Sequence, residues 1–432
     1  MIKMSEMGFC PENSAHDNYI ALQNAVNCGG DIYIDVPGVY KLNDTVTIGD
    51  NTSVYFCNGA YIKREKNPAE TGPVFINKGA YQKIFNHNIK ICGLKLICDG
   101  VVSDEVNINS KKGIMGISAH IVFYYIKNLE IHDFQCLDLP AKDFCIQICT
   151  FENVVVRNVH IEGLKDGIHF GKGSGFRVHH GLFKTFDDPI ALNSYDYSIS
   201  NPEIGWIENG VIEDCRDLND TQTVGYFCRI SAGGWVDWFE GMEVQWSDTV
   251  CHNGRLYRVV FGKPDGKVYK SYTPPVHESG YGEYDGIWWY MMQDGNEGGC
   301  ACRNIFFRDI FLQKKRDYAL SMSSSKNEWC RNYYPNAPVA VHDNISFENV
   351  VCADEVKTLI YSASPFYNVR FSGCAFNGCN IILDNINTPG MEYPKANIFI
   401  SDSVIKGKKD DFIKKADGRE INVKMQNCIE QL

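Results

Sequence analysis

Short runs of alternating apolar and polar residues recur along most of the chain. Each run opens on an asparagine and closes on a bend-forming residue, as in "NIKICG" from Asn88, "NLEIHD" from Asn128 and "NVVVRN" from Asn153. Runs of the same form begin at Asn304, Asn344, Asn368 and Asn397. Because successive side chains of a strand point to opposite faces, this alternation predicts short, half-buried β-strands.

The spacing of these strands indicates how they assemble. Several intervals lie between 22 and 29 residues, whereas an antiparallel sandwich needs turn signals every ~8–12 residues. Strands this short cannot bury their apolar faces alone, but stacked coils bury them and pair the backbone at about 4.8 Å. We therefore predict an all-β fold, a right-handed parallel β-helix.

The first segment, "HDNYIALQNAVNCGGDIYIDVPGVYKL", predicts a helix, a Gly-Gly stop, a strand and a Pro-Gly turn. We expect a capping helix over residues 14–28, with Asp17 or Asn18 as its N-cap, covering the open end of the first coil. This run is similar to the opening of the pectate-lyase superfamily of right-handed β-helices.

One stretch interrupts the repeat. Residues 237–296 are rich in aromatics, Gly and Pro, which favours short antiparallel strands in an inserted β subdomain. The predicted β-helix then comprises residues 1–236 and 297–432. Trp288 is either part of the core of the insertion or, with Trp235, a stacking surface for the C–H face of a sugar.

Composition narrows the class of protein. A formal net charge of −11 disfavours binding to nucleic acid or anionic membranes, and no apolar run approaches the ~18 residues that span a bilayer. No secretory signal is visible, and the 18 cysteines lack zinc-site spacing and lie mostly in apolar strands. We predict a cytoplasmic protein without metal or cofactor. The sequence leaves open whether it forms a homo-oligomer.

Five predicted strands can be aligned on their apolar positions, and the alignment shows which side chains stack from coil to coil. "DFCIQIC", "KDGIHFG", "DDPIALN", "FCRISA" and "DYALSMS" superimpose without gaps. The alignment puts Ile146, Ile168, Ile190, Ile230 and Leu320 in one interior column. It points Gln147 and His169 outward, with Arg229 in a neighbouring outward column.

The same alignment stacks acids at the bend that opens each strand. Asp166 and Asp188 lie on adjacent coils, and Asp143, Lys165 and Asp187 form the column beside them. One Asp before Gly or Pro can simply stabilise a bend. A set of acids must also overcome mutual repulsion, which favours paired-carboxylate acid/base chemistry.

"KDGIHF", followed 21 residues later by "FDDPIALNS", resembles the catalytic motifs of glycoside hydrolase family 28, the polygalacturonase family. The resemblance implies that Asp187 is the general acid, and that Asp166 and Asp188 hold and deprotonate the attacking water. It covers the β-helix but is sharp only over residues 164–194. Inverting enzymes of this kind separate acid and base by roughly 6.5–9.5 Å to admit that water.

The sequence also departs from the family pattern. Leu164 and Lys165 replace its Asn-Thr, its Gly-His-Gly is missing, and its Arg-Ile-Lys is reduced to "RIS" from Arg229. Lys165 and His169 could supply the missing cation and imidazole. These losses bear on galacturonate specificity more than on hydrolysis.

Three functions follow as alternatives. The first is an inverting, exo-acting hydrolase of pectin-like, plant-derived oligosaccharides, with a pocket walled by residues 194–206 and the insertion. The second is a polysaccharide lyase with Arg229 or Lys165 as base and carboxylates on Ca²⁺. The third is a non-catalytic, tailspike-like glycan-binding protein. The predicted substrate-binding residues are Lys165, His169, Arg229, Asn193, Gln147, Asp143, Trp235 and Trp288.

Overall fold

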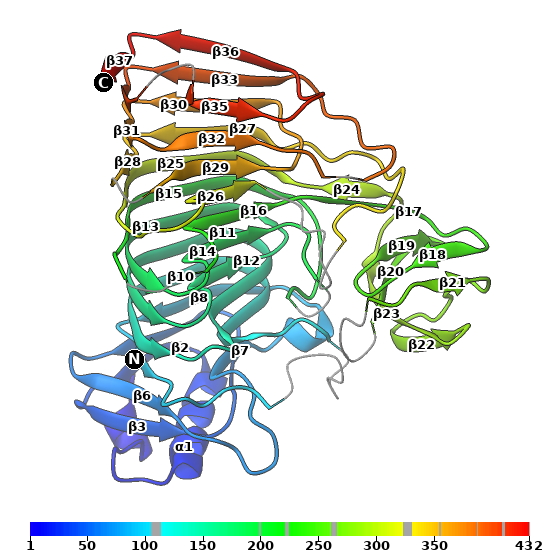
Figure 1. Ribbon diagram of the computed structural model, residues 1–432. Helices are drawn as coiled ribbons and strands as arrows, with labels where there is room; N and C mark the ends of the chain where they lie inside the picture. Colours follow the sequence, from blue (N-terminus) through cyan, green and yellow to red (C-terminus); the bar gives the residue numbers. More distant parts are fainter. Residues whose placement is uncertain are drawn as a thin grey trace.

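The chain winds into a right-handed parallel β-helix whose coils stack from one end of the molecule to the other (Figure 1). The computed structural model describes residues 1–104, 114–197, 200–220, 224–260, 266–322, 331–353, 356–386, 388–407 and 411–431. Within these residues the predicted fold class is confirmed, because the strands of the large sheet pair in parallel with strands one coil away.

Each coil has three faces. The strands β10 (Ala119–Leu139) and β11 (Phe144–Gly163) run through all three, since β10 pairs successively with β7, β8 and β9. The first face holds β1 (Ile2–Lys3), β2 (Gly30–Ile34), β5 (Thr52–Phe56), β8 (Asn86–Cys92), β13 (Gly173–Thr185), β15 (Ile207–Asp217), β25 (Cys302–Leu312), β27 (Asp343–Glu348), β30 (Asn368–Ser372), β33 (Ala396–Ser401) and β36 (Ile421–Gln426).

The other two faces are built from shorter strands. The second adds β3 (Gly38–Leu42), β6 (Ala60–Arg64), β9 (Lys95–Ile97), β28 (Val351–Cys352), β31 (Ala375–Asn377), β34 (Val404–Lys406) and β37 (Ile429–Gln431) to the ends of β13, β15 and β25. The third, called here the short sheet, holds β4 (Val46–Ile48), β7 (Phe75–Asn77), β12 (Ile168–Phe170), β14 (Ile190–Asn193), β16 (Cys228–Ser231), β26 (Leu320–Met322), β29 (Thr358–Ser362), β32 (Asn380–Leu383) and β35 (Ile413–Lys415).

The asparagine that opens each run marks a left-handed bend. Asn88, Asn128 and Asn153 have φ between 56° and 57°, a conformation that asparagine tolerates better than most residues. Their side chains form a ladder between coils, with Asn128 Nδ2 donating to Asn88 Oδ1 at 2.9 Å and Asn153 Nδ2 to Asn128 Oδ1 at 3.3 Å. The repeat in the sequence is therefore a repeat of one bend.

In one coil, the stacked interior residues differ from those that the strand alignment predicts. Ile146, Ile168 and Ile190 stack as predicted, but the next residue in that column is Cys228, followed by Leu320. Ile230 instead pairs with Leu192, so the predicted register was wrong by two residues there. A shift of two preserves which side chains point inward, so hydrophobic alternation cannot distinguish the two registers.

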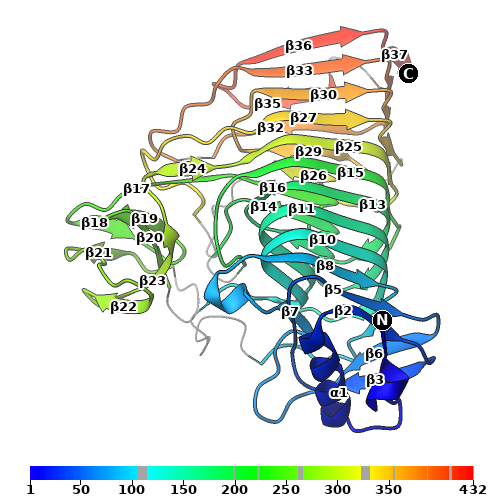
Figure 2. The same ribbon diagram turned by 180° about the vertical axis from the view of Figure 1, so that it is seen from behind.

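The capping helix α1 (Ala15–Cys28) closes the first coil, as Figure 2 shows from behind. Its buried side chains include Leu22 and Val26, which join the core of the β-helix. The N-cap is Ser14, which accepts a hydrogen bond from Asp17 N at 3.1 Å, so the predicted cap was wrong by one turn. Two 3₁₀ turns are η1 (Met4–Met7) and η2 (Ala80–Gln82). Among the described residues, no helix is long and apolar enough to cross a membrane.

The interruption of the repeat is a separate β structure beside the helix (Figure 2). It holds a six-stranded sheet in the order β22-β23-β20-β19-β17-β24 and a β18–β21 pair. Their bounds are β17 (Gly233–Asp237), β18 (Met242–Val244), β19 (Thr249–His252), β20 (Arg255–Val259), β21 (Tyr269–Ser271), β22 (Gly280–Tyr284), β23 (Ile287–Asp294) and β24 (Gly298–Cys300). Trp289 is fully buried in this subdomain, whereas its neighbour Trp288 is 39% exposed.

Candidate active site

Three carboxylates meet at the entry to two adjacent strands of the short sheet. Asp166 precedes β12, and Asp187 and Asp188 precede β14. Because Ile168 pairs with Ile190, Asp166 and Asp188 occupy equivalent positions on successive coils. One oxygen of each of the three carboxylates lies within 4.8 Å of the others.

A lysine and a histidine support this carboxylate cluster. Lys165 Nζ forms ion pairs with Asp187 and, at 3.3 Å, with Asp166 Oδ1. His169 Nδ1 lies 3.1 Å from the other oxygen of Asp166, and the imidazole stacks on Phe144 with ring centroids 4.0 Å apart. Lys165 lies over the same ring at 5.4 Å. Both groups therefore hold Asp166 in one orientation.

Burial and mutual repulsion separate the pKa values of the acids. Burial followed by the charge of Asp166 raises the pKa of Asp187. Burial followed by the charges of Asp187 and Asp166 raises the pKa of Asp188 well above the usual range. Burial would also raise the pKa of Asp166, but the Lys165 charge and the His169 hydrogen bond outweigh it and lower that pKa. These directions favour an ionised Asp166 and make Asp187, and still more Asp188, harder to ionise than an ordinary carboxyl group.

The three acids differ in access to solvent. The Asp187 side chain is 23% exposed and that of Asp166 only 6%, while Asp188 is 3% exposed as a residue. Lys165 is 19% exposed beside Asp187. Asp187 and Lys165 are therefore the members of the cluster that a bound molecule can reach.

A backbone segment that sequence reasoning missed passes directly over the acids. Tyr226 N donates to Asp188 Oδ1 at 2.7 Å. Gly225 has φ of 68°, and a Cβ there would lie 2.5 Å from Asp188 Oδ1 and 2.7 Å from Asp187 Oδ1. Only glycine fits this approach. A lone glycine before an apolar strand was the available signal, but it resembles any other turn.

The residues after β14 lie against the short sheet, where the sequence predicted a wall beside the site. Asp196 forms an ion pair with Arg229 at 3.1 Å, and Ser200 Oγ lies 3.3 Å from His169 Nε2. Asn193 Nδ2 donates to Asp196 at 2.7 Å. Asp196 and Ser200 were not predicted as site residues, because their spacing from β14 gives no periodic signal.

Two predicted substrate-binding residues are held by bonds within the protein itself: Asp143 away from the cluster, and Gln147 beside His169 on the neighbouring coil. Asp143 is fully buried in an ion pair with Arg64 at 3.1 Å, where it also accepts hydrogen bonds from Ser103, so it does not join the carboxylate cluster. Gln147 is buried, and its amide donates to the carbonyls of Gly116 and Ser200. The polar groups of both side chains are therefore engaged in hydrogen bonds or an ion pair within the protein.

The two tryptophans lie in or beside the insertion. Trp235 is 7% exposed and donates its indole N–H to the Asn296 carbonyl at 2.7 Å. Trp288 lies on β23 opposite Glu283 of β22. A role for either ring in sugar stacking stays a prediction.

The carboxylate cluster is also the kind of donor set that a hard cation prefers. Lys165 already places a positive charge against two of its three members, Asp166 and Asp187. The structure therefore neutralises the cluster with an ammonium group, which supports acid/base chemistry by the carboxylates themselves.

These features define a class of protein: a right-handed parallel β-helix with a carboxylate cluster on its short sheet. The chain is similar over 100% of its length to 91% of an exopolygalacturonase from Thermotoga maritima, with TM-score 0.58 and 13% identity. It is similar over 100% of its length to 77% of a family 28 exopolygalacturonase from Yersinia enterocolitica, with TM-score 0.50 and 12% identity.

A structure of another kind shares the architecture. The chain is similar over 99% of its length to 52% of the pre-mature gene product 12 of bacteriophage phi29, with TM-score 0.52 and 13% identity. The sequence matched no protein-family model and no curated protein. At such low sequence identities the structural similarity establishes the fold alone. Evidence for the function must therefore come from the geometry of the site.

Proposed function

We propose that this protein is a glycoside hydrolase that acts on pectin-like oligosaccharides containing uronic acid. The observation that carries the proposal is the convergence of Asp166, Asp187 and Asp188 from adjacent coils, with only Asp187 substantially open to solvent. The fold likeness to two exopolygalacturonases is consistent with it.

The pKa shifts support a division of roles. Asp187 acts as the general acid, because its raised pKa retains a proton and its exposure lets it reach a glycosidic oxygen. Asp166 is ionised and accepts a proton from the attacking water, while Asp188 helps to hold that water. Since Asp187 and Asp188 interact, they titrate as a pair and share the retained proton.

Two cations favour an acidic sugar. Lys165 is partly exposed beside the proton donor, and Arg229 is 16% exposed in its ion pair with Asp196. A sugar carboxylate placed near Lys165 would compete with Asp187 for the ammonium group. That competition would help Asp187 to keep its proton until the glycosidic oxygen takes it, because losing the Lys165 contact raises the pKa of Asp187 further.

The lyase alternative needs an unprotonated base. Although burial opposes it, the charges of Asp166 and Asp187 raise the pKa of Lys165. Asp196 and Asp188 likewise raise that of Arg229. Both groups therefore stay protonated, which disfavours a lyase. Absorbance of an unsaturated product, lost on adding a chelator, would instead support the lyase.

The test is a screen of pectin-derived and other plant oligosaccharides, with product anomers followed by NMR. We expect hydrolysis with inversion. The carboxylate oxygens approach within 4.8 Å, whereas carboxyl groups are ~6.5–9.5 Å apart in inverting enzymes and ~5–5.5 Å apart in retaining ones, so a product that retains the anomer would contradict this expectation.

We predict that Asp187→Asn lowers kcat by ~10²–10⁴-fold, because it removes the proton donor. Thermal stability should be retained, because the change also relieves repulsion with Asp166 and Asp188. The measurement is kcat on the substrate found in the screen, with circular dichroism as the folding control. Glycan binding without turnover in both proteins would instead identify a non-catalytic binding protein.

A further inference from the structure

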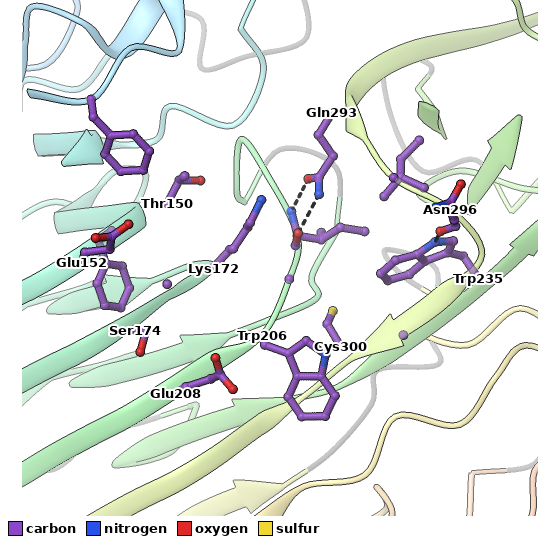
Figure 3. A pocket seen from close by; sticks show the side chains of 18 residues that line it. Thr150, Glu152, Lys172, Ser174, Trp206, Glu208, Trp235, Gln293, Asn296 and Cys300 are labelled. Atoms are coloured by element: carbon purple, nitrogen blue, oxygen red, sulfur yellow. Dashed lines mark hydrogen bonds between the residues drawn. The ribbon is translucent and has the colours of Figure 1, made fainter. Parts of the chain in front are cut away.

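A cavity lies between the β-helix and the inserted subdomain. Its volume is about 450 Å³, within the ~300–1,000 Å³ typical of small-molecule sites. Thr150, Lys172 and Trp206 line it from three successive coils, and Leu256, Gln293 and Asn296 line it from the insertion. Figure 3 shows these walls on either side of one hollow.

This junction pocket is distinct from the carboxylate cluster. Asp166 precedes β12 and Lys172 follows it, so the two sites lie at opposite ends of one strand. Six residues of chain span at most roughly 20 Å, at about 3.3 Å per residue when fully extended. The segment that contacts His169 through Ser200 continues to Ile204 and Trp206 at the pocket.

Paired hydrogen bonds hold the two walls together. Ile204 N donates to Gln293 Oε1 at 2.9 Å, and Gln293 Nε2 donates to Ile204 O at 3.0 Å, as the dashed lines in Figure 3 show. The Trp235 indole is fixed by its bond to the Asn296 carbonyl. The pocket is therefore formed before any ligand arrives, which lowers the entropic cost of binding.

The aromatic lining suits a sugar ring. Trp206 and Trp235 lie on either side of Cys300, and Phe85 and Phe151 also line the pocket. Trp206 is only partly buried, and the Arg303 guanidinium lies 4.9 Å from its ring centroid. A partly exposed indole offers a C–H-binding surface, while Ser174 and Asn296 supply polar groups for hydroxyls.

Charge pairing at the pocket argues against an anionic ligand. Lys172 pairs with Glu203 at 3.3 Å, and Glu208 pairs with Arg303. Glu152 pairs with Lys127 at 2.9 Å. Every charged residue that lines the pocket, among those described, thus already has an opposite partner. A carboxylated sugar would have to displace one of these pairs, whereas a neutral sugar would not.

We propose that the junction pocket binds one neutral pyranose residue of a glycan, with its apolar face against Trp206. The role goes beyond hydrolysis at the carboxylate cluster and does not depend on it. The pocket would hold a part of the glycan remote from any bond that is cleaved.

The test uses the whole 432-residue chain and a panel of neutral methyl glycosides, the galactoside, glucoside, xyloside and rhamnoside, with galacturonic acid as the anionic comparison. Tryptophan fluorescence titration and saturation-transfer NMR report binding. We expect a neutral glycoside to bind with Kd near ~1 mM, about −4 kcal/mol, and more tightly than galacturonic acid at this pocket.

Matched variants assign the signal to the pocket. Trp206→Ala should weaken binding by tenfold or more, and Ser174→Phe, which fills the pocket without removing a tryptophan, should do the same. Tyr272→Ala, at a 56% exposed aromatic of the insertion that does not line the pocket, is the control and should leave Kd unchanged. Asp187→Asn should also leave it unchanged, so a failed hydrolase proposal would not affect this result.

Three outcomes would overturn the proposal. The first is that no neutral glycoside in the panel binds. The second is that Ser174→Phe and Trp206→Ala, both folded by circular dichroism, bind as the wild type does. The third is that galacturonic acid binds more tightly than the neutral glycosides and loses affinity in Ser174→Phe.

Discussion

Adjacent aspartates at 187 and 188 are tolerated because each meets a different partner. Asp187 faces Lys165, and Asp188 accepts a backbone N–H from Tyr226. Asp166 divides its two oxygens between Lys165 and His169. Burial, together with the repulsion that remains among the acids, raises the pKa values of Asp187 and Asp188.

Variants of Lys165 can separate its binding of a substrate carboxylate from its neutralisation of the neighbouring acids. We predict that Lys165→Met raises KM for a uronate substrate by tenfold or more, while Lys165→Arg retains most of the affinity. Removing the cation breaks the ion pair of Asp187 and leaves Asp166 with His169 alone, and breaking a buried pair costs about 3–5 kcal/mol. The measurements are KM and urea unfolding.

An unchanged KM for the folded fraction of Lys165→Met, together with lower stability, would contradict the binding role. Lys165 would then serve only to neutralise its acidic neighbours.

The pKa directions predict the pH profile. Asp187 works protonated, so kcat/KM should fall as pH rises through its raised pKa. Asp166 works ionised, so the acidic limb should lie below the usual carboxylate range. The prediction is an alkaline limb displaced upward from about pH 4, measured as kcat/KM against pH at constant ionic strength. A profile without that limb would exclude Asp187 as the acid.

At the scale of the strands, the asparagine ladder holds the coils in register. We predict that Asn128→Ala destabilises the protein by about 1–3 kcal/mol, because it forces a left-handed bend on alanine and removes two ladder hydrogen bonds. Asn128→Gly loses the same hydrogen bonds but keeps the bend, so it should cost less. Urea unfolding midpoints of the two variants give the comparison; equal losses would show that the bend carries no strain.

For the whole molecule, the prediction concerns the insertion and the segment after β14, which we expect to decide whether a glycan is cleaved at its end or in mid-chain. Both lie beside the short sheet and are joined through Gln293 and Ile204. We predict exo action that releases mono- or disaccharides from a chain end. Viscosity and reducing ends followed together on a long substrate test this. A rapid fall in viscosity with few reducing ends would show mid-chain cleavage and refute it.

The sequence by itself determined the β-helix, its capping helix and the meeting of Asp166 with Asp188. These follow from local properties, because alternation sets which side chains face inward and 22 residues complete the coil from Ile168 to Ile190. The same count brings Lys165 beside Asp187.

Only the tertiary structure decided which residues pair where the length of the coil changes. Thirty-eight residues separate Ile190 from its neighbour Cys228, so the period is lost and the register of Arg229 could not be read from it. Asp143 finds Arg64, 79 residues away, and the residues after β14 lie against His169. The contacts of a long loop depend on which residues lie near it in space. Neither the alternation of apolar and polar residues nor their spacing along the chain contains that information.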